Sequence, residues 1–288
     1  MSAILDIRRL RARLKDGGNL IRDVSMQVQA GEVHGLVGES GAGKTMIARA
    51  ILGILPESVR IIGGQIRFDD ADLLVMHPSA RRKLLGRQLA MIPQDPLTAL
   101  NPSRRIVRQI TDVLRHHLKL SRSESRAEAL RLLQEVHIRD PEQVLERFPY
   151  ELSGGMRQRV LIAIAFACKP KLIVADEPTT ALDVTVQKQI LRLIAEMKAR
   201  HGTAMLFVTH DLSVVAQMCD RVTVLHSGMV VEDGTTSQIL SRSAQPFTRA
   251  LMAAMPRHDR PGEMLEPVPE HIQQELISRA TAYDRSHR

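Results

Sequence analysis

One glycine-rich segment has the residue types and the spacing of a loop that holds nucleotide phosphates. It fits the pattern G-x-x-x-x-G-K-[ST] over Gly38, Glu39, Ser40, Gly41, Ala42, Gly43, Lys44 and Thr45. The glycines let the backbone approach phosphates without an intervening Cβ, and N–H groups at the next helix start face the anion. We expect Lys44 to reach the β- and γ-phosphates and the Thr45 hydroxyl to ligate Mg²⁺. The alternative is a chance glycine-rich turn. A strand-like run, Val33–Val37, precedes the segment and a helix-like run, Met46–Leu52, follows it, which is the context that a phosphate loop requires and a chance turn does not.

A pair of carboxylates follows the apolar run Leu172–Ala175, which reads as a buried strand. Ligands of parallel α/β sheets sit beyond the carboxyl ends of the strands. Asp176 is therefore predicted to hold the hydration shell of Mg²⁺, and Glu177 to accept a proton from the attacking water as general base. A strand that ends in Asp-Glu is weak evidence alone and becomes strong beside a phosphate loop.

A second anion site is indicated by Leu152–Arg159, where a hydroxyl and two glycines open a helix that we expect to run to Cys168. The plain alternative is a glycine-capped turn before a helix. The segment resembles the signature motif of ABC ATPases, in which the signature of one subunit closes over the nucleotide held by a second subunit. The resemblance implies that ATP bound by a partner is contacted by Ser153, Gly154, Gly155 and Gln158.

Three further motifs of that family are matched. Gln94 resembles the Q-loop glutamine, which senses the metal and links the core to a helical lobe. Asp183, in Ala181–Asp183, resembles the D-loop residue at the dimer interface, where we expect it to help form the nucleotide site. His210 resembles the switch histidine that holds the γ-phosphate and the attacking water, although a lone histidine is more often structural. The implied catalytic set is Glu177, His210, Gln94 and Lys44, with Thr45, Gln94 and Asp176 at the metal.

The adenine platform departs from the family pattern. Family members usually stack the adenine on an aromatic residue about two dozen positions before the phosphate loop, whereas this chain has no aromatic residue before Phe68. By register Leu14 takes that place, with Leu20 as the alternative. An aliphatic side chain packs against a base without π-stacking.

Two segments are similar to those of ATPases from oligopeptide, dipeptide and nickel importers, namely Pro93–Pro102 and Gln245–Leu251. The resemblance implies a bacterial importer of peptides or a related small solute, such as a nickel chelate or an opine. Its expected partners are two permease subunits, a second ABC ATPase subunit, identical or not, and indirectly an extracytoplasmic solute-binding protein. The expected place is the cytoplasmic face of the inner membrane, peripherally bound. Many relatives carry a cysteine-containing C-terminal segment; this tail has none, so no iron–sulfur cluster is expected.

Composition narrows the functional classes. Aromatic residues make up 2% of the 288 residues, which argues against stacking recognition of single-stranded nucleic acid. The net charge of +8 arises from scattered clusters such as Arg81–Lys83, so a solvated face or membrane proximity is favoured over nucleic acid. Cys168 and Cys219 are expected to be buried thiols, and the longest apolar run, Val160–Cys168, is too short to span a membrane.

The elements that position these residues alternate between strands and helices, which indicates an α/β fold. The expected architecture is a RecA-like P-loop core with a mostly parallel sheet, an N-terminal antiparallel β subdomain and an inserted α-helical subdomain. We expect an ABC ATPase domain over 1–256, with the core at 1–94 and 167–235, the helical subdomain at 95–166 and C-terminal helices at 236–256. A polar extension, 257–288, is expected to be poorly packed, with one short helix near His271–Ala280.

Two other classes of ABC ATPase are disfavoured by the sequence. A nucleic-acid ABC ATPase usually has a very long coiled coil between the phosphate loop and the signature, and no heptad array lies between Lys44 and Ser153. An exporter or lipoprotein-release ATPase is disfavoured by Leu97–Pro102 and Pro246–Leu251. No nucleic-acid partner is expected.

Overall fold

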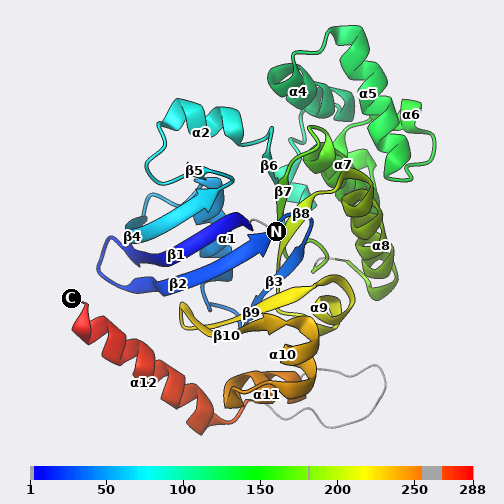
Figure 1. Cartoon of the computed structure of the whole chain (residues 1–288). Coiled ribbons are helices and arrows are strands. Elements are labelled where there is room, and N and C mark those ends of the chain that lie inside the picture. Colours follow the sequence, from blue (N-terminus) through cyan, green and yellow to red (C-terminus); the bar gives the residue numbers. More distant parts are fainter. Residues whose placement is uncertain (1–2, 181, 255–267, 288) are drawn as a thin grey trace. The chain divides into compact units, whose positions relative to one another are not determined.

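The computed structural model describes residues 3–180, 182–254 and 268–287 (Figure 1). The chain forms two compact units, one of Met1–Met76 with Leu206–Arg288 and the other of His77–Met205.

The first unit contains a four-stranded antiparallel sheet in the order β2-β1-β4-β5. Its strands are β1 (Ala3–Leu14), β2 (Asn19–Gln29), β4 (Val59–Phe68) and β5 (Ala71–Asp72). Ile7 pairs with Met26 on β2 and with Ile66 on β4, and the side chains of all three are buried. The N-terminal antiparallel sheet predicted from the sequence is confirmed.

A second set of strands in this unit carries the phosphate loop. The buried β3 (Val33–Gly38) runs parallel to β9 (Arg221–His226), which pairs antiparallel with β10 (Met229–Thr235). Helix α1 (Lys44–Leu52) follows the loop and ends at Gly53, whose φ of 70° provides a left-handed cap.

The C-terminal part of the first unit is helical. It contains α9 (Leu212–Met218), α10 (Thr236–Arg242), α11 (Pro246–Ala253) and α12 (Glu270–Ser286, red in Figure 1). Helix α12 is longer than the expected short helix, and Leu276 and Ala280 are buried. The expectation of a poorly packed tail is therefore wrong for 270–286, because an apolar stripe and a long-range ion pair hold this helix. Residues 257–267 lie outside the described part of the chain.

The second unit pairs two parallel strands, β6 (Leu89–Ile92) and β7 (Leu172–Asp176), with helices. Leu89 is in register with Leu172. The helices are α2 (Pro78–Leu84), α3 (Pro96–Ala99), α4 (Ile106–Leu118), α5 (Arg122–Glu135), α6 (Pro141–Glu146), a 3₁₀ turn (Pro149–Glu151), α7 (Gly154–Phe166) and α8 (Val184–His201). The chain passes between the units within β8 (Ala204–Thr209).

Local capping signals set several of these boundaries. Ser121 and Glu124 form a capping box at the start of α5. Pro141 occupies the first turn of α6, and the Asp140 side chain forms no cap because its backbone is left-handed, with φ 49°. One face of α8 is apolar and buried through Ile190, Leu193, Ile194 and Met197.

The two cysteines are unpaired and buried. Burial raises the pKa of Cys168 to about 11 and that of Cys219 to about 12, so both side chains are neutral thiols at neutral pH. Within the described residues, the structure has no helix that combines the length and the apolarity needed to span a membrane.

Candidate functional site

The phosphate-loop segment leaves the buried end of β3 and enters α1 through residues with left-handed backbone. Gly41 has φ 83° and Gly43 has φ 100°. A Cβ on Gly38 would lie 2.2 Å from the carbonyl oxygen of Leu225, so any other residue would displace β9 or the loop. Glycine is therefore required both by the turn and by the close approach of the neighbouring strand.

Lys44 is buried at the first position of α1. Its Nζ donates hydrogen bonds to the carbonyl oxygens of Gly38 (2.8 Å) and Glu39 (2.9 Å). No side chain caps the start of α1 in the described part of the chain. The combination of glycine cradle, uncapped helix start and buried ammonium group fits the phosphates of a nucleotide.

The other predicted site residues of the first unit are less enclosed. His210 is exposed and lies directly after β8, one residue before the Asp211 cap of α9. Leu14 ends β1, and its Cδ1 lies 3.5 Å from where a Cβ of Gly18 would be. The carbonyl oxygen of Leu20 lies 3.2 Å from where a Cβ of Gly43 would be. Leu20 thus borders the phosphate loop through its backbone, whereas Leu14 packs over the turn between β1 and β2.

In the second unit, two predicted residues from distant segments meet. Gln94 Nε2 donates a hydrogen bond to Glu177 Oε2 at 3.1 Å. Thr180 Oγ1 donates to the same oxygen, also at 3.1 Å. Glu177 has a left-handed backbone, with φ 46°, directly after the buried Asp176 at the end of β7. Such a conformation is costly for a residue with a Cβ, and the two hydrogen bonds help to hold it.

The signature segment and the D-loop segment lie side by side in the same unit. Ser153 caps α7, its Oγ accepting from the Met156 N–H at 3.3 Å. A Cβ on Gly155 would lie 3.0 Å from Cγ1 of Val186 in α8. Asp183 caps α8 by accepting from the N–H groups of Thr185 and Val186. Gly154 is exposed, and Ala181 lies outside the described residues.

Gln158 differs from the other signature residues because its side chain is fully buried in α7. Neither amide atom of Gln158 has a hydrogen-bond partner among the described residues. The predicted contact of Gln158 with a partner's nucleotide stays a prediction, and in this structure the side chain is not exposed.

Sequence reasoning missed two features that touch the predicted residues. Thr180 donates a hydrogen bond to the Glu177 carboxylate. The sequence feature that could have indicated this bond is the position of Thr180, three residues after Glu177. Gln273 Nε2 lies 3.4 Å from Glu39 Oε1, which brings α12 to the phosphate loop. No local pattern near Gln273 could have indicated that contact.

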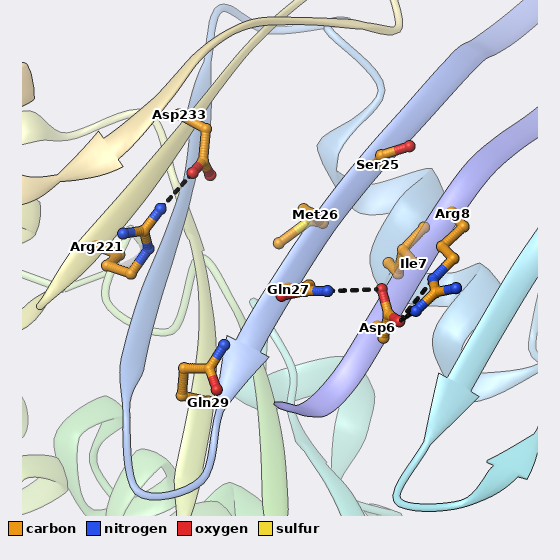
Figure 2. Close-up of a pocket in the computed structure, with 9 residues that line it drawn as sticks. All are labelled: Asp6, Ile7, Arg8, Ser25, Met26, Gln27, Gln29, Arg221 and Asp233. Atoms are coloured by element: carbon orange, nitrogen blue, oxygen red, sulfur yellow. Dashed lines mark hydrogen bonds and ion pairs between the residues drawn. The ribbon is translucent and has the colours of Figure 1, made fainter. Parts of the chain in front are cut away.

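Other cavities in the described part of the chain lie away from the predicted site residues. One, of about 640 Å³, lies in the first unit, is lined by Asp6, Arg8, Gln27, Arg221 and Asp233 among others, and contains none of the predicted site residues (Figure 2). Its charged residues already form ion pairs, Arg8 with Asp6 and Arg221 with Asp233. Another, of about 460 Å³, lies in the second unit and is lined by α4, α5 and their flanking residues, among them Arg105, Arg108, Arg115, Arg122 and Arg126. Arginines of α4, α5 and their flanking residues thus line one groove together with Glu146, which pairs with Arg126.

Comparisons with known proteins identify the family of this chain. The family described as ABC transporter matches residues 21–180. The probable D,D-dipeptide transport ATP-binding protein DdpD of Escherichia coli (strain K12) is 47% identical, over 92% of this chain and 82% of its own length. The oligopeptide transport ATP-binding protein OppD of Bacillus subtilis (strain 168) is 42% identical, over 91% of this chain and 75% of its own length.

A solved structure supports the same assignment. CbiO1 from Clostridium perfringens, part of the ABC transporter complex cbiONQ, has a TM-score of 0.72 at 26% identity, over 84% of this chain and 92% of that chain. This likeness confirms the predicted α/β, RecA-like fold class. Because the family match covers more than half of the chain and the relatives align over most of it, this chain belongs to the ABC transporter family and is an ATP-binding, ATP-hydrolysing subunit.

Proposed function

We propose that this chain drives the uptake of peptides or a related small solute, such as a nickel chelate or an opine. The observation that carries the proposal is the 47% identity to a D,D-dipeptide transport ATP-binding protein over 92% of the chain. The segments Pro93–Pro102 and Gln245–Leu251, which are similar to those of peptide and nickel importers, support it further.

The roles proposed for the phosphate-loop residues follow from their chemistry. Gly38–Thr45 surrounds the phosphates, and Lys44 exchanges its bonds with the Gly38 and Glu39 carbonyls for bonds to the β- and γ-phosphates. Thr45, Asp176 and Gln94 would hold Mg²⁺, which supplies positive charge to the transferring phosphoryl group when it is bound. Oxygen ligands of this kind suit a hard cation.

The proposed hydrolytic step uses the residues around Glu177. Glu177 accepts a proton from the attacking water, and Gln94 and Thr180 orient its carboxylate through their hydrogen bonds. His210 holds the γ-phosphate and the water. Ser153, Gly154, Gly155, Gln158 and Asp183 complete the site of a second subunit, since the family resemblance assigns the signature and the D-loop to the dimer interface.

The proposed partners are two permease subunits, a second ABC ATPase subunit and, indirectly, an extracytoplasmic solute-binding protein. The proposed location is the cytoplasmic face of the inner membrane, through the permeases. In this assembly ATP binding favours the closed ATPase pair, and hydrolysis resets it.

A deletion strain tests the proposed function. Cells that lack this chain should lose uptake of labelled di- and oligopeptides, and wild-type protein should restore it, while a Lys44→Ala variant expressed at the same level should not. Affinity capture of the tagged wild-type chain from detergent-solubilised membranes should yield two permeases. Unchanged peptide uptake in the deletion strain, together with capture of permeases for another solute, would assign the transporter to that solute instead.

A further inference from the structure

We propose that α12 forms part of the nucleotide-binding site, with the ring of Tyr283 as a contact for the base of ATP. The inference rests on the assignment of Gly38–Thr45 to the phosphates of ATP. It concerns the first unit alone.

The C-terminal end of α12 is fixed to the start of β2 by a two-pronged ion pair. Asp284 Oδ1 accepts from Arg22 Nε at 2.7 Å, and Asp284 Oδ2 accepts from Arg22 Nη2 at 2.8 Å. Asn19 Nδ2 donates to Oδ1 at 2.8 Å, and Arg22 Nη1 donates to the Ser227 carbonyl at 2.6 Å. The Arg22 side chain is 13% exposed. Bidentate pairs that are partly buried are the stronger and more directional kind, so this end of α12 is held in one position.

The N-terminal part of α12 reaches the phosphate loop itself. Gln273 Nε2 lies 3.4 Å from Oε1 of Glu39, the second residue of the loop. The helix therefore extends from the phosphate loop to the start of β2, where Asn19 and Arg22 lie.

One face of α12 is directed towards these elements. Gln273, Leu276, Ala280 and Tyr283 are separated by three, four and three positions, which places them on one side of a helix. Leu276 and Ala280 are buried. Tyr283 continues that face beside Asp284, the residue that fixes the helix to β2.

Unlike a residue of the core, Tyr283 keeps part of its side chain exposed and available for a contact. Its ring is only half-buried and stacks on His287, with 4.0 Å between centroids and 12° between planes. Its hydroxyl is buried and has no hydrogen-bond partner in the described residues. The other phenylalanine and tyrosine rings of this unit, which are Phe68, Phe207 and Phe247, are buried in the core.

The start of β2 connects the phosphate loop to the end of α12 that carries Tyr283. The Leu20 carbonyl lies against Gly43 at the end of the phosphate loop, and the adjacent Asn19 is bonded to Asp284. Neither β1 nor β2 has an aromatic side chain, so any ring contact on this side of the loop has to come from another element. Arg22 neutralises the Asp284 carboxylate, so α12 brings a ring to this position without an unpaired negative charge near the phosphates.

Binding of ATP and of inorganic tripolyphosphate to the full-length chain tests the inference, because only ATP has a base. Tyr283→Ala should weaken ATP binding about two- to tenfold, the range expected for one aromatic contact, and leave tripolyphosphate binding unchanged. Tyr283→Phe should bind ATP like the wild type. Tyr150→Ala, which changes the other tyrosine, at an exposed position in the second unit, is the matched control and should change neither affinity.

A second variant tests the attachment of α12. Asp284→Ala should weaken ATP binding to a similar extent, spare tripolyphosphate, and speed hydrogen exchange of the α12 amides. If Tyr283→Ala weakens the binding of ATP and tripolyphosphate equally, or tightens the binding of both, the base contact is overturned. Helix α12 would then support or cover the loop instead. Unchanged ATP binding in Tyr283→Ala would also overturn it. Failure of the wild type to bind either ligand would instead refute the phosphate-loop assignment.

Discussion

Gln94 donates a 3.1 Å hydrogen bond to the Glu177 carboxylate, although the two residues are 83 positions apart. Gln94 follows β6 and Glu177 follows β7, and these strands are parallel neighbours in register. The carboxyl ends of the two strands therefore meet at one edge of the sheet, and the residues that follow them come within hydrogen-bond distance. A substitution at Glu177 is therefore expected to change the hydrogen bonding of Gln94.

Replacement of Glu177 by Gln should keep ATP binding and lower turnover at least about 100-fold, because an amide can accept the Gln94 bond but cannot take a proton from water. Steady-state phosphate release and nucleotide affinity measure the two effects. The trapped closed dimer should appear in size-exclusion chromatography with ATP. Glu196→Gln, which removes an exposed carboxylate paired with His137, is the control. Normal turnover in Glu177→Gln would remove Glu177 as the base.

Replacement of Ser153 by Arg should spare ATP binding and block hydrolysis, since Ser153 is assigned to the nucleotide of the opposite subunit. The variant also loses the cap on α7, which costs about 1 kcal/mol of stability. Ser153→Ala loses the same cap without adding bulk and serves as the control for that cost in thermal melts. Weak ATP binding by Ser153→Arg would refute an assignment to the opposite subunit.

Replacement of Leu14 by Tyr should tighten ATP binding about two- to tenfold if the base lies at the end of β1. The same substitution should restore ATP affinity when combined with Tyr283→Ala, since both rings would serve one base. Titrations with ATP and tripolyphosphate check this, with Leu14→Met as a control that adds no ring. An unchanged affinity for ATP would move the base away from Leu14 and leave Leu20 as the aliphatic contact.

Replacement of Gly228 by Ala should destabilise the fold by about 1–3 kcal/mol and weaken nucleotide binding. The new Cβ would lie 2.2 Å from the Leu20 carbonyl oxygen at a φ of 71°, and the Gly228 N–H donates to the Ala42 carbonyl in the phosphate loop. Gly31→Ala is the matched control, since its φ is 73° and nothing lies within 4 Å of the new Cβ. Equal melting temperatures for the two variants would show that the clash is relieved at no cost.

Replacement of Glu135 by Gln should lower the melting temperature at pH 7. Burial raises the pKa of Glu135, but the hydrogen bond from Arg200 and the charge of Arg131 outweigh it, so the pKa is lowered overall. A lowered carboxyl pKa stabilises the fold above the unfolded value of about 4.3, and this contribution is lost as pH falls through the folded value. The difference between variant and wild type should therefore shrink below about pH 4.3. Glu142→Gln, at an exposed position, is the control; a difference that stays constant with pH would exclude the ionised carboxylate as its source.

Several elements of the site were predictable because they depend on interactions between residues that are close together in the sequence. The phosphate loop, the helix start at Ser153 and the strand that ends at Asp176 depend on residues within a few positions of one another. Glycine backbone freedom, capping and apolar periodicity act over that range, so the sequence alone predicted these elements and the chemistry at their ends.

The tertiary structure decided what depends on contacts between distant segments. The length of α12 follows from burial of Leu276 and Ala280 and from the Arg22–Asp284 ion pair, which spans 262 positions. Helices gain most of their stability from such packing and not from local propensity, so the short helix expected near His271–Ala280 was an underestimate. The sequence by itself determined the phosphate-loop and signature segments and predicted the residues proposed to act with them. Only the tertiary structure placed a C-terminal tyrosine-bearing helix against that loop, because no local rule relates residues so far apart.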